Sequence, residues 1–129
     1  MEKTKKLRLS ALHFEHELWS MEVNFFKDEL KLYQKWLEEV ASKNTHEDVL
    51  KQVEHFQNQF IIQKNQLSVL KHQIKAHEQW LSGYAAERPV AIDHASFADH
   101  AVMRENVETS KKLYTDLKLE FKRFLEERM

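Results

Sequence analysis

The chain has 129 residues, of which 42% are hydrophobic and 32% charged, and its formal net charge is −1 at pH 7. That length fits a single domain over residues 1–129, and the near-zero charge argues against nucleic acid or an anionic membrane as a partner. There is no cysteine, which excludes disulfide bonds, thiolate metal ligands and cysteine nucleophiles.

The composition predicts an all-α protein made of three long, mutually antiparallel helices in an up-down-up bundle. Gly83 is the only glycine and Pro89 the only proline. Because turns consume these residue types, their scarcity favours few and long elements. We therefore expect helices that gain their stability from packing on one another, since long helices are weak alone in water.

The first helix is expected over residues 10–43, with Ser10 as its N-cap. A break after it, followed by acidic residues in the spacing of a capping box, starts a second helix expected over 45–81. The segment 82–93 holds the glycine and the proline and is the expected loop. A third helix then spans 94–127. The short first connection makes the first two helices antiparallel.

Apolar residues recur in alternating steps of three and four within each helix, which indicates coiled-coil-like packing. The residues that form this seam are Trp19, Val23, Phe26, Leu30, Tyr33, Leu37 and Val40, then Val49, Val53, Phe56, Phe60, Leu67, Leu70, Ile74 and Leu81, and finally Met103, Val107, Tyr114, Leu117, Phe121 and Phe124. Their burial is expected to be the main stabilising contribution, at roughly 1.5–3 kcal/mol for each side chain.

The first helix carries more apolar side chains than two neighbouring helices can cover. The additional residues, with two from the second helix, are Phe14, Leu18, Met21, Phe25, Leu32, Ile62 and Val69. A large apolar patch is unusual on a monomer, so we expect a homodimer that buries it. Two alternatives remain: a wide core contact in a bent bundle, and recognition of a partner helix through the apolar face of the first helix.

Polar side chains also repeat every seven residues inside the apolar arcs of the first two helices. If the chain reverses near residue 44, Glu22 lies near Gln66 and Glu29 lies near Gln59. A buried carboxylate needs a hydrogen-bond donor, and a glutamine amide supplies one. The sequence therefore predicts a buried ladder of Glu–Gln hydrogen bonds; a water-filled seam and a carboxylate-rich site are the alternatives.

Six of the eight histidines should gather at one end of the bundle: His13, His16, His72, His77, His94 and His100. His16, His77 and His100 continue the apolar seams, so one inward imidazole comes from each helix. Three converging imidazoles suit Zn²⁺ or another divalent transition-metal ion. Glu15 and Asp99 are the acids that could add a ligand or orient an imidazole. The alternatives are a structural polar cluster and a pH-sensitive end.

No motif indicates a reaction, because neither a paired Glu-x-x-His pattern nor a glycine-rich phosphate loop is present. We expect a small, non-enzymatic, self-associating scaffold or interaction module without an organic cofactor. The alternative function is a metal-binding helical bundle. Neither a signal peptide nor an apolar run of about 18–20 residues occurs, so the expected location is the cytoplasm.

Overall fold

The structure is a computed structural model that describes the backbone of residues 2–87 and 94–128, and the side chains of 10–83 and 99–128. Helix α1 spans Glu2–Lys43, α2 spans Glu47–Glu87 and α3 spans His94–Arg128, and the described ranges contain no strand. The prediction of an all-α protein with three long helices is therefore confirmed.

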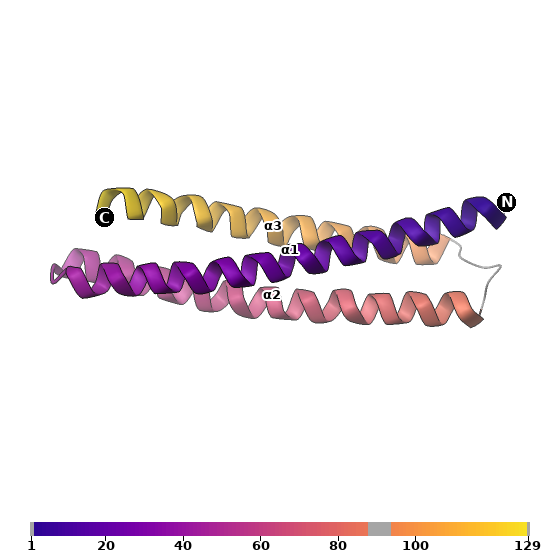
Figure 1. Ribbon diagram of the computed structural model, residues 1–129, viewed down its shortest axis with the longest axis horizontal. Coiled ribbons are helices and arrows are strands. Elements are labelled where there is room, and N and C mark those ends of the chain that lie inside the picture. The colour runs from indigo at the N-terminus through magenta and orange to yellow at the C-terminus, as the bar shows by residue number, and fades with distance from the viewer. Residues whose placement is uncertain (1, 88–93, 129) are drawn as a thin grey trace.

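Each helix packs against the other two. Figure 1 shows that the start of α1, the end of α2 and the start of α3 lie at one end of the molecule. At that end the ring of His16 lies 4.9 Å from the ring of His77 and 5.0 Å from that of His100. At the other end the rings of Phe56 and Phe124 are 5.0 Å apart. Side chains from distant parts of the sequence thus meet at both ends.

Two helix boundaries differ from the expected ones. Helix α1 begins at Glu2, so Ser10 lies inside the helix and does not cap it; no glycine or proline precedes Ser10 to end the helix there. Helix α2 continues through Gly83 to Glu87, since one glycine costs a helix only about 0.5–1 kcal/mol. The rest of the expected loop, residues 88–93, lies outside the described residues.

The connection between α1 and α2 occupies residues 44–46. The side-chain amide of Asn44 donates a hydrogen bond of 2.8 Å to the Val40 carbonyl, which satisfies one of the last carbonyls of α1. His46 caps α2, because the backbone N–H of Asp48 donates to its Nδ1 at 3.4 Å. The acidic first turn of α2 also favours a helix start. The second helix therefore begins two residues later than expected.

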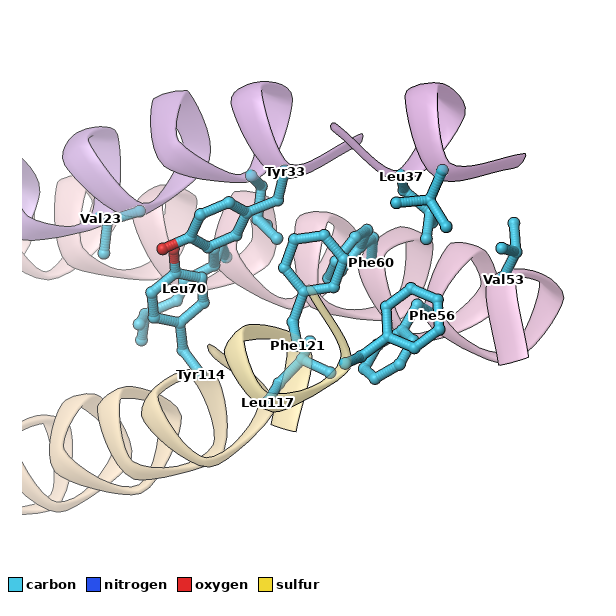
Figure 2. Packing of buried hydrophobic residues seen from close by; sticks show 14 of the residues in the cluster. Val23, Tyr33, Leu37, Val53, Phe56, Phe60, Leu70, Tyr114, Leu117 and Phe121 are labelled. Atoms are coloured by element: carbon cyan, nitrogen blue, oxygen red, sulfur yellow. The ribbon is translucent and has the colours of Figure 1, made fainter. Parts of the chain in front are cut away.

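Aromatic side chains fill the centre of the core. Phe60 and Phe121 are fully buried, and their rings meet edge to face at 4.9 Å, as Figure 2 shows. Tyr33 packs on Phe121 at 5.2 Å. The predicted seam residues are buried except Phe26 and Met103, which are partly buried against the same core. Gln63 is also buried, although the apolar pattern does not include it.

The seven side chains of the expected interface are all exposed, with exposed fractions from 42% to 69%. The alternative that a wide core contact buries these seven side chains is therefore wrong. Val69 lines a groove between α2 and α3 together with Leu113, which corrects its grouping with the residues of α1. The exposed apolar face of α1 consists of Phe14, Leu18, Met21, Phe25 and Leu32, and we call it the α1 apolar stripe.

The predicted Glu–Gln ladder is wrong, because Glu22 and Glu29 pair with side chains of α3. Glu22 pairs with Lys111 at 2.7 Å. Glu29 accepts hydrogen bonds from the Tyr114 hydroxyl and, at 3.0 Å, from Lys118 Nζ. On α2, Gln66 is exposed and lines the groove with α3, while Gln59 is half-buried. Side chains of α3 therefore take the place of the glutamines that were expected to pair with Glu22 and Glu29.

A ladder of ion pairs joins α1 to α3 in place of the expected one. Its three rungs are Glu15–Arg104, Glu22–Lys111 and Glu29–Lys118. The partners in each rung are separated by 89 positions (104 − 15, 111 − 22 and 118 − 29). A constant difference at heptad spacing requires the two helices to run in the same direction in one register. The ladder thereby fixes the level at which α3 meets α1.

Candidate metal centre

Three imidazoles from three helices meet at the end of the molecule where α1 begins. His16 comes from α1, His77 from α2 and His100 from α3, and one ring nitrogen of each lies within 4.8 Å of the others. The seam positions bring them together, because His16 and His100 occupy the places of core residues and are only 2% exposed. Histidine is the commonest metal ligand in proteins, as the neutral imidazole.

The ring nitrogens that face the centre of this cluster have few partners. His77 Nδ1 and His16 Nε2 lie 3.0 Å apart and share one hydrogen bond. The second nitrogen of His77, Nε2, and Nδ1 of His100 are buried and have no hydrogen-bond partner among the described residues. A buried polar atom without a partner costs about 1–3 kcal/mol, so the protein tolerates two of them in one small space.

Two carboxylates hold the outer edges of the imidazoles. Glu78 on α2 accepts one hydrogen bond from Nδ1 of His16 and another from Nδ1 of His13. Glu15 on α1 accepts a hydrogen bond of 2.8 Å from Nε2 of His100. His16 and His100 therefore each direct one nitrogen to a carboxylate and the other toward the cluster.

Burial and charge favour the neutral forms of His77 and His100. Burial lowers the pKa of His77, and positive charge on His16 or His100 would lower it further. Burial also lowers the pKa of His100, and this effect outweighs the opposing influence of Glu15. Metal ions bind neutral imidazole, so lowered pKa values keep these ligands available at neutral pH.

The two acids remain ionised in this environment. Hydrogen bonds from Arg104, with help from His100, hold the pKa of Glu15 at about 2 against the effect of burial. Burial alone would raise the pKa of Glu78, but the hydrogen bonds from His16 and His13 lower it overall. Each carboxylate can therefore accept a hydrogen bond from a ring N–H, as carboxylates next to metal-bound histidines do.

Tryptophan 19 forms one wall of the cluster. The Trp19 ring stacks on the His100 ring with centroids 5.0 Å apart and 22° between the planes, and it lies 5.6 Å from His16. Because Trp19 is itself buried, this side of the cluster is closed to water. On another side the Trp80 ring lies 5.8 Å from that of His77.

The distances suit a single tetrahedral ion after small movements. Two nitrogens that each lie 2.0–2.1 Å from a zinc ion are about 3.3 Å apart in a tetrahedral site. None of the three ligand atoms is more than 4.8 Å from another, so the largest separation has to shorten by about 1.5 Å (4.8 − 3.3) for one ion to hold all three.

The other residues expected at this site have different places. Asp99 is exposed and does not belong to the group of ligands, although its charge opposes the lowering of the His77 pKa. Glu15 contacts His100 from the outside and so occupies the second of the two roles expected for it. His72 is exposed, and the side chain of His94 lies outside the described residues.

The heptad pattern of the sequence did not indicate Glu78 or its contact with His13. A signal for both was present, because Glu78 follows His77 and lies about level with His13 and His16 after the reversal near residue 44. As a charged residue beside the apolar seam, Glu78 has the usual features of a solvent-exposed position, and only the contact itself distinguishes it.

No helix in the described residues is both long and apolar enough to span a membrane. No protein-family model, curated protein or solved structure matches the chain.

Proposed function

We propose that this protein binds one divalent transition-metal ion, with zinc as the leading choice, through His16, His77 and His100. The observation that carries the proposal is the convergence of three ligand nitrogens within 4.8 Å, each from a different helix. A nitrogen-only donor set of imidazoles suits zinc, copper, nickel or iron better than calcium or magnesium, which prefer oxygen ligands.

A bound ion would also explain why the cluster is buried. Two of its nitrogens lack a hydrogen-bond partner, and coordination would satisfy lone pairs that are otherwise costly to bury. Since the ligands come from all three helices, the ion would connect them at one end of the protein. The role we propose is therefore non-enzymatic, with the metal stabilising the fold and the surfaces that the helices present.

The groove between α1 and α2 is the route by which we propose that the ion enters. This groove has a volume of about 480 Å³ and reaches both His16 and Glu78. Lys71 and Lys75 also line the groove, and Met21 and Ile74 contribute apolar surface to it. The edge of the cluster next to Glu78 is therefore the side from which we expect an ion to enter.

Metal analysis and calorimetric titration of protein purified without a histidine tag test this proposal. We expect one zinc ion per chain and a loss of affinity of at least tenfold in His77→Ala. The matched control is His72→Ala, which removes an exposed histidine from the same helix and should leave the affinity unchanged. Absence of any bound transition metal, or wild-type affinity in His77→Ala, would overturn the proposal.

A second candidate function is self-association of an up-down-up bundle as a scaffold or interaction module. It is favoured by the α1 apolar stripe, whose five side chains are between 42% and 69% exposed in a single chain. They follow steps of three, four and seven residues along one face of α1, which is the pattern of a helix that packs on another helix. A two-fold dimer would bury the stripe of each chain against that of its partner.

Sedimentation or light scattering over a range of protein concentrations tests self-association. We expect a dimer for the wild-type protein and a monomer for Phe25→Glu, which places a charge in the middle of the stripe. Leu119→Glu is the control, since Leu119 is similarly exposed but lies on α3. A strict monomer at all concentrations would contradict the dimer and favour recognition of a helix from another protein through the same stripe.

A further inference from the structure

The carboxylates of Glu78 and Glu15 contact the proposed site only through the outer nitrogens of two of its ligands. Glu78 Oε2 is bound to Nδ1 of His16, and Glu15 Oε1 lies 2.8 Å from Nε2 of His100. The two histidines are therefore held by opposite ring nitrogens. In a neutral imidazole one nitrogen carries the proton and the other the lone pair, and a carboxylate selects the nitrogen that carries the proton.

We infer that Glu78 and Glu15 are positioning residues that hold His16 and His100 in opposite tautomers, so that Nε2 of His16 and Nδ1 of His100 present their lone pairs to one metal ion. This inference rests on the proposed function for its final step, the binding of the metal. The assignment of tautomers does not depend on metal, because both carboxylates accept their hydrogen bonds from the histidines in the protein without metal.

The unpartnered nitrogens support this assignment. His100 Nδ1 is buried and has no partner, as expected for a lone pair that faces the cluster while Nε2–H donates to Glu15. His16 Nε2 has only the 3.0 Å contact with His77 Nδ1. With its own proton on Nδ1, His16 accepts the N–H of His77 at this contact. His77 Nε2 is then a lone pair as well, which agrees with its lack of a partner.

Glu78 has the more demanding of the two tasks. Histidine in water prefers the tautomer with its proton on Nε2, which is the tautomer that Glu15 selects for His100. His16 must adopt the less favoured tautomer, with its proton on Nδ1. Both oxygens of Glu78 are occupied, one by His13 and one by His16. His13 thus restrains the carboxylate, which in turn restrains His16.

Nitrogen-15 NMR of the metal-free wild-type protein at pH 8 tests the assignment directly. We expect His16 to show a protonated Nδ1 and an unprotonated Nε2, and His100 to show the reverse. In Glu78→Ala, the Nε2–H form of His16 should become the major one. A His16 with its proton on Nε2, or on both nitrogens, in the wild-type protein would overturn the inference, whether or not the protein binds metal.

Zinc titration supplies the second measurement. Removal of an outer carboxylate from a metal-bound histidine typically costs 10–100-fold in affinity, so we expect such a loss in both Glu78→Ala and Glu15→Ala. Glu54→Ala is the matched control, since Glu54 is an exposed acid of α2. Zinc binding in the wild type with unchanged affinity in Glu78→Ala would reject the positioning role and leave the metal site standing. Correct tautomers without any zinc binding would reject the proposed function instead.

Discussion

The guanidinium group of Arg104 donates two hydrogen bonds to the carboxylate of Glu15, one of 2.9 Å from Nε to Oε2 and one of 2.6 Å from Nη2 to Oε1. The same Oε1 accepts the hydrogen bond from His100. A bidentate pair of this kind is stronger and more directional than a single contact. The first rung of the ladder between α1 and α3 therefore also holds an edge of the candidate metal centre.

Replacement of Arg104 by Ala should raise the pKa of Glu15. The hydrogen bonds from Arg104 are the largest influence that holds this pKa at about 2, and without them burial acts against the ionised carboxylate. We expect the pKa to move toward its ordinary value of 4.5, measured by carbon-13 NMR of the side-chain carboxyl group. Arg123→Ala, an exposed change on α3, should leave it in place. An unchanged value in Arg104→Ala would mean that other groups hold the charge.

Stability should fall steeply when the pH drops below about 4.5. The pKa values of Glu15, Glu29 and Glu78 are all lower in the folded protein than the ordinary value of 4.5. The unfolded chain therefore binds more protons in this range, and the free energy of unfolding decreases as the pH falls. The contribution is complete above pH 4.5 and is lost as the pH falls through the folded values.

Urea unfolding at intervals between pH 7 and pH 2 measures this effect. Glu29→Gln should flatten the pH dependence, because its carboxylate no longer titrates between Tyr114 and Lys118. Glu38→Gln removes an exposed acid of the same helix and should leave the slope unchanged. If stability were constant from pH 5 to pH 3, the acids would not be stabilised by their partners in the folded state.

The ladder shows what the apolar pattern could and could not predict. Heptad spacing was sufficient to identify core residues such as Phe60 and Phe121, which are fully buried. It also located Glu29 at the edge of the core. The identity of the neighbour at that edge depends on whether α3 packs to the left or the right of the first two helices. The spacing within one helix carries no information on that choice, so Lys118 was missed.

The histidine cluster was easier to predict than its outer contacts. His16, His77 and His100 continue apolar seams and lie at similar levels once the chain reverses, so packing of the seams in the observed register brings their ligand nitrogens to within 4.8 Å of one another. Glu78 belongs to no seam, and its role depends on side-chain geometry within a fraction of a turn. The helix ends were also uncertain, because Ser10 and Gly83 have weak effects that long neighbouring helices override.

Truncation of the central aromatic core should be strongly destabilising. Phe60 is fully buried against Phe121 and Phe56, so Phe60→Ala removes packing and leaves a cavity. We expect a loss of about 3–5 kcal/mol in the free energy of unfolding, measured by urea denaturation. The adjacent change Ile61→Ala is the control, since Ile61 is exposed and should cost much less. Equal effects of the two changes would contradict the orientation of α2.

Replacement of Gly83 by Ala should stabilise the protein. Gly83 lies inside α2, and an added Cβ would meet no atom within 4 Å. Alanine in a helix is favoured over glycine by about 0.5–1 kcal/mol, partly because the unfolded chain loses freedom. Thermal unfolding followed by circular dichroism should show a higher midpoint than for the control Ser82→Ala. A midpoint of Gly83→Ala below that of the wild-type protein would show that α2 does not continue through this position.

Binding of Cu²⁺ should quench the fluorescence of Trp19 and of Trp80, whose ring lies 5.8 Å from that of His77. The Trp19 ring stacks on His100 at 5.0 Å and lies 5.6 Å from His16, so a paramagnetic ion held by these histidines would lie close to the indole. By contrast, the partly buried Trp36 packs near Tyr33 against the core and should be affected less. The imidazole site is suited to copper, which binds nitrogen ligands more strongly than zinc does.

The measurement compares wild-type protein with Trp19→Phe during titration with Cu²⁺. We expect saturable quenching with one equivalent of metal in the wild type, and a smaller fractional change in Trp19→Phe. Because phenylalanine keeps an apolar ring at this position, the ligands should retain their places. The same titration of His100→Ala should lose the one-equivalent saturation, since it deletes a ligand. Equal fractional quenching in wild type and Trp19→Phe would place the bound copper away from Trp19.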